Sequence, residues 1–205
     1  MQFEHPVGIE RDKWIGEQVG CPAFKVSICN DDLDVAEDVF LPGDGEAAVF
    51  VYAKVPVSHQ RAVNYLLSKG FQFVETTALY VKSVTVPENV AASGFRFADT
   101  NESAAHIDAL GNLARDAFVF GDFHVDPKMS ASVGGRIREQ WVRNFFHGTR
   151  GTHMIVSESD GEISGFLLLV VSPPDITIDL IAVAGNYRGK CIASDLIRFA
   201  ETCFS

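Results

Sequence analysis

Residues 188–193, Arg-Gly-Lys-Cys-Ile-Ala, have the composition and position of a phosphate-binding turn. They follow an apolar segment at 175–184 that predicts a strand, and they precede a helical apolar pattern that begins at Ile192. The first turn of a helix has unpaired backbone N–H groups and the positive end of the helix dipole. A turn with small side chains would therefore let a pyrophosphate reach those N–H groups.

Four residues of this turn bear on phosphate binding. Gly189 and Ala193 leave room for a ligand, while Arg188 and Lys190 add positive charge to a chain that is otherwise acidic. An ordinary strand-to-helix turn with two solvated cations would contain the same residues. The spacing alone leaves both interpretations open.

The composition excludes several classes of protein. The 205 residues include 17 Lys and Arg against 27 Asp and Glu, and the resulting net charge of -10 disfavours nucleic acid and anionic membranes as partners. The N-terminus lacks the apolar core of a signal peptide, and the longest apolar run, 166–171, is too short to cross a bilayer. The four cysteines have no metal-binding spacing. We therefore expect a cytoplasmic protein with free thiols and no metal.

The apolar pattern predicts two domains. Residues 1–88 are expected to form a small α/β domain with a strand at 47–55, a helix from Ser58 to Gly70 and a second strand at 71–84. The acidic run at 30–38 predicts a solvated face.

Residues 89–205 predict a second domain with the order strand, helix, helix, strand, strand, strand, helix. Its first helix follows a strand at 95–99 and is expected to begin at a capping box of Asp99 and Glu102. A polar loop at 120–130 comes next. The later elements are a helix through Ile137, Trp141 and Phe145, strands at 152–158 and 163–171 joined by a turn longer than the two-residue type, a strand at 175–184 and a helix from Ile192.

The motif Arg188-Gly-Lys-Cys-Ile-Ala193, behind the strand Ile-Asp-Leu-Ile-Ala-Val, resembles the acyl-CoA signature of the GNAT superfamily of N-acetyltransferases, (Gln or Arg)-x-x-Gly-x-(Gly or Ala). The predicted order of elements is also the order of that fold. The resemblance implies an α/β (α+β) GNAT acyl-CoA N-acyltransferase fold, acetyl-CoA as cosubstrate and a primary amine as acceptor. It implies that Arg188, Gly189, Lys190, Cys191, Ile192 and Ala193 bind the CoA pyrophosphate, and that Ile181, Ala182 and Val183 hydrogen-bond the pantetheine arm.

Cys191 is the one departure, because the signature has glycine there. A cysteine would weaken binding if the backbone needed a positive φ or if phosphate touched the α-carbon. We expect instead that Cys191 lies in the first helical turn, where a side chain is tolerated.

Residues 51–82, 114–130 and 140–146 resemble the two-domain TDP-fucosamine N-acetyltransferases. These enzymes acetylate the 4-amino group of dTDP-4-amino-4,6-dideoxygalactose for bacterial surface polysaccharide. The resemblance implies a nucleotide-linked amino-deoxysugar as the acceptor, and it places the loop that carries His124 and Asp126 towards that acceptor.

Acetyl transfer needs a group that takes the amine's proton and an acid that protonates the thiolate. Asp179, expected on the strand face opposite Leu180, is a candidate base, although a structural carboxylate explains it equally well. His124 and Asp126 would contact the sugar or act as a base, or they belong to an ordinary exposed loop. The resemblance implies a tyrosine acid beyond the last helix, where this sequence has none, so the general acid is unassigned.

The resemblance also implies that the fold is incomplete at its C-terminus. A missing fifth strand would leave an apolar strand edge at 178–183 unpaired, so we expect a homo-oligomer, most simply a dimer. Two alternatives to an enzyme stay open: a catalytically inactive acyl-CoA or nucleotide-binding module that acts through its dimer, and a structural remnant with no ligand.

Overall fold

The computed structural model describes residues 7–28, 48–84, 94–119 and 121–204. The chain divides into two compact units, residues 1–75 and 76–205. The domain boundary predicted at 88/89 and the acidic run at 30–38 fall outside the described residues.

The N-terminal unit contains a three-stranded sheet and two helices. Strand β2 lies in the middle of the sheet, antiparallel to β1 and parallel to β3. Helix α2 packs Ala62, Tyr65 and Leu66 against β2, so the predicted strand and helix at 47–70 are confirmed. The first three elements were not predicted from the sequence. The bounds are β1 Val7–Arg11, α1 Lys13–Val19, β2 Ala23–Ile28, β3 Phe50–Ala53 and α2 Gln60–Ser68.

The predicted strand at 71–84 is wrong. These residues belong to no helix or strand, and none of them pairs with a described strand. The side chains of Phe73, Leu79, Tyr80 and Val81 are 71–91% exposed. Alternating β-forming residues alone therefore do not make a strand here, because no described strand pairs with them.

The C-terminal unit has the predicted order of elements, with two short helices in addition. Its four strands form an antiparallel sheet in the order β4-β5-β6-β7. This mixed α/β architecture is consistent with the GNAT acyltransferase fold. The bounds are β4 Phe95–Phe97, α3 Ala104–Ala117, α4 Asp122–Val125, α5 Ala131–Phe146, β5 His153–Ser159, β6 Glu162–Ser172, β7 Asp175–Val183, the 3-10 helix η1 Gly185–Tyr187 and α6 Ile192–Phe204.

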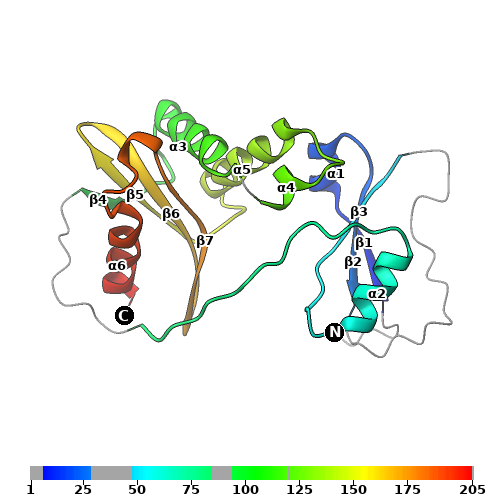
Figure 1. The fold of residues 1–205 in the computed structure, drawn as a ribbon. Coiled ribbons are helices and arrows are strands. Elements are labelled where there is room, and N and C mark those ends of the chain that lie inside the picture. The colour runs from blue at the N-terminus through cyan, green and yellow to red at the C-terminus, as the bar shows by residue number, and fades with distance from the viewer. Residues whose placement is uncertain (1–6, 29–47, 85–93, 120, 205) are drawn as a thin grey trace. The chain divides into compact units, whose positions relative to one another are not determined.

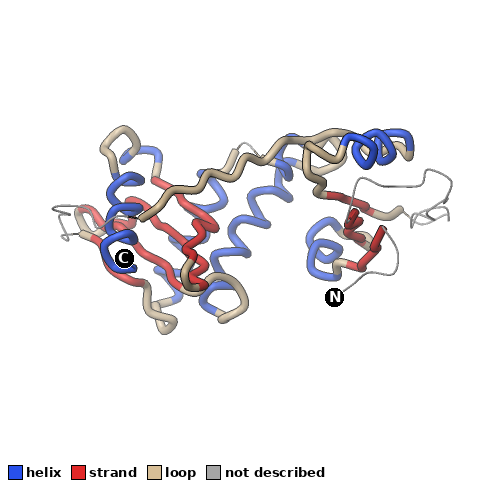
Figure 2. The backbone as a smooth tube through the Cα atoms, turned by 90° about the horizontal axis from the view of Figure 1, so that it is seen from below, coloured by secondary structure: helices blue, strands red, loops and turns tan. Residues whose placement is uncertain are grey.

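Helices cover both faces of this sheet, with α3 and α5 on one face and α6 on the other (Figures 1 and 2). Strand β6 shows why: Phe166 and Leu168 join the core with α3 and α5, whereas Leu167 and Leu169 join the core with α6. Successive side chains of a strand point to opposite faces, so an unbroken apolar run predicts a strand buried on both sides.

Three local predictions in this unit are corrected. Helix α3 is capped by Ser103, whose hydroxyl accepts from the backbone N–H of His106, so Asp99 is not its N-cap. The loop at 120–130 contains the one-turn helix α4. Asp160 and Gly161, both with positive φ, form a two-residue turn between β5 and β6, which is the tight hairpin type that matches strand twist.

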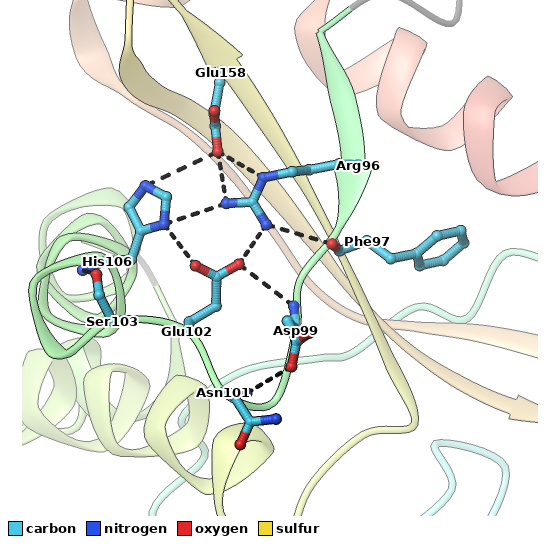
Figure 3. A network of polar contacts seen from close by, with 8 residues as sticks. All are labelled: Arg96, Phe97, Asp99, Asn101, Glu102, Ser103, His106 and Glu158. Carbon is cyan, nitrogen blue, oxygen red and sulfur yellow. Dashed lines mark hydrogen bonds and ion pairs between the residues drawn. The ribbon is translucent and has the colours of Figure 1, made fainter.

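A polar network ties the start of α3 to the sheet (Figure 3). Arg96 of β4 donates to Glu102 and, at 2.8 Å, to Glu158 of β5. The Nδ1 atom of His106 lies 2.7 Å from Glu102. Burial acts to raise the pKa of Glu102, but hydrogen bonds from Arg96 and His106 outweigh it and lower the pKa from 4.5 to about 2.

This lowered pKa predicts a loss of stability in acid. A carboxylate whose pKa is lower in the folded state stabilises the fold above its unfolded value, and that contribution disappears as the pH falls from about 4.5 to about 2. Because Arg96 is partly exposed, we expect a contribution of about 2 kcal/mol rather than more. Urea unfolding at pH 7 and pH 3 should show a smaller pH effect for Glu102→Gln than for the wild type. Equal losses in the two proteins would contradict the prediction.

Candidate functional site

Strand β7, η1, the turn at 188–191 and helix α6 form the predicted strand–turn–helix. The first intrahelical hydrogen bond of α6 runs from the N–H of Asp195 to the carbonyl of Cys191, at 3.0 Å. The N–H groups of residues 192–194 therefore have no partner within the helix. Together with the dipole of a helix of 13 residues, they make this end of α6 suitable for a phosphate.

The two cations of the turn are exposed beside this helix start. The Nε–H of Arg188 donates to the carbonyl of Val183 at 3.2 Å, which ties the arginine to the end of β7. The ammonium of Lys190 lies 4.8 Å from the ring centroid of Tyr187. Gly189 has a φ of 77° and open space where a Cβ would stand. The residues present thus fit a pyrophosphate.

The expectation that Cys191 lies in the first turn of the helix is wrong. Its φ is 62°, in the left-handed region that favours glycine, and it precedes α6 rather than lying in its first turn. The glycine of the GNAT signature thus corresponds here to a backbone that does need positive φ. The cysteine adopts this conformation at a cost in free energy.

We expect Cys191→Gly to stabilise the protein. Glycine has no Cβ to oppose the left-handed conformation, so the free energy of unfolding should rise by about 0.5–1 kcal/mol. Urea unfolding measures this change. Cys191→Ala is the matched control, because it removes the thiol and keeps the Cβ. Equal stability of the two variants would contradict the strain at this position.

Gly165 of β6 lets the start of α6 approach the sheet. A Cβ at this position would lie 2.9 Å from the carbonyl oxygen of Ala182 and 3.2 Å from Cγ2 of Ile192. Gly165 pairs with Val183, so the contact lies directly beneath the end of β7. No sequence signal marked this glycine, because its role depends on a neighbour that arrives from later in the chain.

Asp179 occupies an irregularity in β7. Leu168 pairs with Leu180 and Leu169 with Ile178, so Asp179 is an extra residue in the ladder, as in a β-bulge. The expected alternation with Leu180 fails at this point. Leu180 joins the core with α3 and α5, and Trp141 of α5 packs against the same core. Asp179 binds an arginine that contacts Trp141, so its side chain lies on the same face of the sheet as Leu180.

That arginine is Arg150, which the sequence analysis did not single out. Its Nε and Nη2 atoms donate to the two carboxylate oxygens of Asp179 at 2.7 and 2.8 Å. Its guanidinium carbon lies 3.7 Å from the ring centroid of Trp141. Asp179 is therefore a paired carboxylate, as the structural interpretation expected. This pairing does not exclude Asp179 as the base.

The structure does not join His124 and Asp126 to Asp179 by any hydrogen bond or ion pair of the described residues. His124 packs its ring against Gly134 of α5, where a Cβ would lie 2.6 Å from Cε1, and its Nδ1 atom has no described hydrogen-bond partner. Asp126 accepts from the N–H of Lys128 at 2.8 Å and so shapes the turn before α5.

No general acid emerges from the described tyrosines. The hydroxyl of Tyr52 donates to Asp12 at 2.8 Å, and Tyr80 is almost fully exposed. Tyr187 is the last residue of η1, and its hydroxyl donates to the carbonyl of Ser159 at 3.3 Å. Burial, together with the charges of Glu162 and Asp160, raises its pKa.

Two further findings concern the described residues alone. They contain no group of three or more His, Cys, Asp or Glu side chains placed to hold a metal ion. They also include no helix that combines the length and the apolar character needed to cross a membrane.

Two comparisons with known proteins bear on this site. Residues 109–204 match the acetyltransferase (GNAT) family. The chain is also 33% identical over 90 residues to the spore coat polysaccharide biosynthesis protein SpsD of Bacillus subtilis (strain 168). That alignment covers 44% of this chain and 31% of the relative, so the chain spans about a third of the relative's length.

The family match includes the helices α5 and α6, the sheet strands β5 to β7 and the whole turn at 188–193. The family uses acetyl-CoA as its cosubstrate.

Proposed function

We propose that this protein transfers an acetyl group from acetyl-CoA to a primary amine of a nucleotide-linked amino-deoxysugar. The observation that carries the proposal is the turn at 188–193 between β7 and α6. It combines helix N–H groups, two cations and an open glycine, and it lies within the region that matches the acetyltransferase family.

The turn and the strand before it would hold the cofactor. Acetyl-CoA, when bound, supplies the thioester that is attacked. The helix start and the cations face its pyrophosphate, and the backbone of the last residues of β7 hydrogen-bonds its pantetheine arm. The proposed cofactor-binding residues are Ile181, Ala182, Val183, Arg188, Gly189, Lys190, Cys191, Ile192 and Ala193.

In the proposed reaction the amine nitrogen forms a bond to the acetyl carbonyl carbon, and the carbon–sulfur bond breaks. The nitrogen loses a proton, which Asp179 accepts directly or through water. The thiolate takes up a proton, for which no side chain is assigned. Each oxygen of Asp179 keeps a further acceptor site after it binds Arg150, because a carboxylate accepts about four hydrogen bonds.

A sugar acceptor is supported by the name of the relative, which refers to polysaccharide biosynthesis. His124 and Asp126 are proposed to contact that acceptor from α4 and from the turn after it. Association as a homodimer and a cytoplasmic location stay predictions, and light scattering in solution checks the first of them.

Release of the CoA thiol tests the proposed activity. With acetyl-CoA and dTDP-4-amino-4,6-dideoxygalactose, we expect thiol release that depends on the enzyme and one N-acetylated product by mass spectrometry. The matched acceptor is dTDP-6-deoxygalactose, which has a hydroxyl in place of the amine. Equal thiol release with the two sugars, or none with the amine, would contradict acetyl transfer to this class of acceptor.

One observation favours a second function, that of an inactive acyl-CoA or nucleotide-binding module. Both oxygens of Asp179 already accept hydrogen bonds from Arg150. A module of this kind would bind acetyl-CoA in calorimetry and release no thiol with any amine.

A further inference from the structure

The loop after α5 docks on the sheet at the point where the β6–β7 ladder is irregular. Gly151 has a φ of 69°, and a Cβ there would lie 2.6 Å from Cδ1 of Leu168. The N–H of Thr152 donates to the carbonyl of Leu169 at 2.7 Å. The register shift in β6 falls between Leu168 and Leu169. The loop is thus held against the two residues that face the bulge.

This docking explains how Arg150 reaches Asp179. Arg150 precedes Gly151 in the docked loop, and Asp179 is the extra residue of β7 opposite the same two leucines. The two nitrogens of the guanidinium bind the two carboxylate oxygens in parallel, a geometry that fixes direction as well as distance. The face of Trp141 supports the guanidinium from α5.

The carboxylate needs this support. The side chain of Asp179 is 20% exposed and that of Arg150 28% exposed, so each is largely withdrawn from water. A bulge residue lacks the regular ladder bonds that fix the direction of its neighbours in β7. Without Arg150, the carboxylate would lose its charge partner and would be free to turn.

We propose that Arg150 is a positioning residue that holds the carboxylate of Asp179 towards the acceptor amine, with Trp141 holding Arg150. The inference rests on the proposed acetyl transfer and adds a residue to it. Arg150 acts through Asp179 and does not itself exchange a proton.

The test measures kcat and the KM for acetyl-CoA with dTDP-4-amino-4,6-dideoxygalactose, for Arg150→Met, Asp179→Asn and the double variant. We expect Arg150→Met to lower kcat by about 10- to 100-fold and to leave the KM for acetyl-CoA within about twofold. Because Arg150 acts through Asp179, the double variant should be no slower than Asp179→Asn alone. If Arg150 had only a structural role independent of Asp179, the fold-losses in kcat of the two single variants would multiply in the double variant.

Two further variants separate positioning from folding. Arg96→Met removes an arginine from the network of Figure 3 and should keep the wild-type kcat. Arg150→Lys keeps the charge but cannot bind both oxygens in parallel, so its kcat should lie between those of the wild type and Arg150→Met. If Arg150→Met fails to fold, the kcat of Arg150→Lys alone tests the positioning role.

Each other outcome overturns the proposal. An unchanged kcat in Arg150→Met, or multiplied losses in the double variant, would show that Arg150 does not act through Asp179. Acetyl-CoA binding without any transfer by the wild type would remove the reaction for which Asp179 is positioned. Absence of acetyl-CoA binding would overturn the proposed function itself, and calorimetry distinguishes that failure from the others.

Discussion

Arg188→Glu is expected to abolish detectable acetyl-CoA binding. The substitution places a carboxylate where the turn now presents a guanidinium to the proposed pyrophosphate site, and it removes the hydrogen bond from Arg188 to the carbonyl of Val183. Loss of a charge-assisted contact and gain of a repulsive one should weaken binding by roughly 100-fold or more. Isothermal titration calorimetry with acetyl-CoA measures the change.

Arg61→Glu is the matched control for this prediction. Arg61 is exposed on α2 in the N-terminal unit, and its replacement changes the formal net charge of -10 by the same two units. Its acetyl-CoA affinity should stay within about threefold of the wild type, because Arg61 is not one of the residues of β7, the turn and α6 that are proposed to bind the cofactor. Equal losses in the two variants would show that Arg188 acts through overall charge and not through a local site.

Gly165→Ala is expected to lower both the stability of the protein and its affinity for acetyl-CoA. The added Cβ would collide with the carbonyl oxygen of Ala182 and press on Ile192. Strand β7 and the start of α6 would therefore have to move away from β6. Overpacking of this kind costs about 1–3 kcal/mol of unfolding free energy. Because the turn at 188–193 joins the two displaced elements, acetyl-CoA binding should weaken as well.

Gly185→Ala provides the comparison. Gly185 has open space where a Cβ would stand and no positive φ, so alanine there should change the unfolding free energy by less than about 0.5 kcal/mol. Urea unfolding and calorimetry are performed on both variants. If Gly165→Ala were as stable as Gly185→Ala and bound acetyl-CoA as the wild type does, the close approach of α6 to β6 would be refuted.

The strand–turn–helix of the site could be predicted from the sequence because each part depends on local pattern. The apolar run of β7, the small and basic residues of 188–193 and the helical spacing from Ile192 are all contiguous. The buried face of α5 and the hairpin of β5 and β6 were predicted for the same reason.

Predictions failed where conformation depends on contacts between distant residues. The positive φ of Cys191 occurs in the turn that joins β7 to α6, two elements that both lie close to Gly165 of β6. The bulge at Asp179 breaks the strict alternation that a strand pattern assumes, and its partner Arg150 stands in a loop without a motif. The residues 71–84 have the pattern of a strand but no described strand beside them.

The order of elements was nevertheless sufficient to indicate the fold. A helix cap at Ser103 rather than Asp99, or the extra turn of helix at α4, changes boundaries and leaves the layers intact. Both faces of β6 are buried, so helices must cover the sheet on each side. The pattern of residues in the C-terminal unit predicted those helices.

The central claim is that the turn between β7 and α6 binds acetyl-CoA, and backbone amide NMR tests it most directly. Titration of the ¹⁵N-labelled chain with acetyl-CoA should give saturable shift changes concentrated at residues 181–183 and 188–194. Shift changes confined to residues 1–75, or none at millimolar acetyl-CoA, would contradict the account.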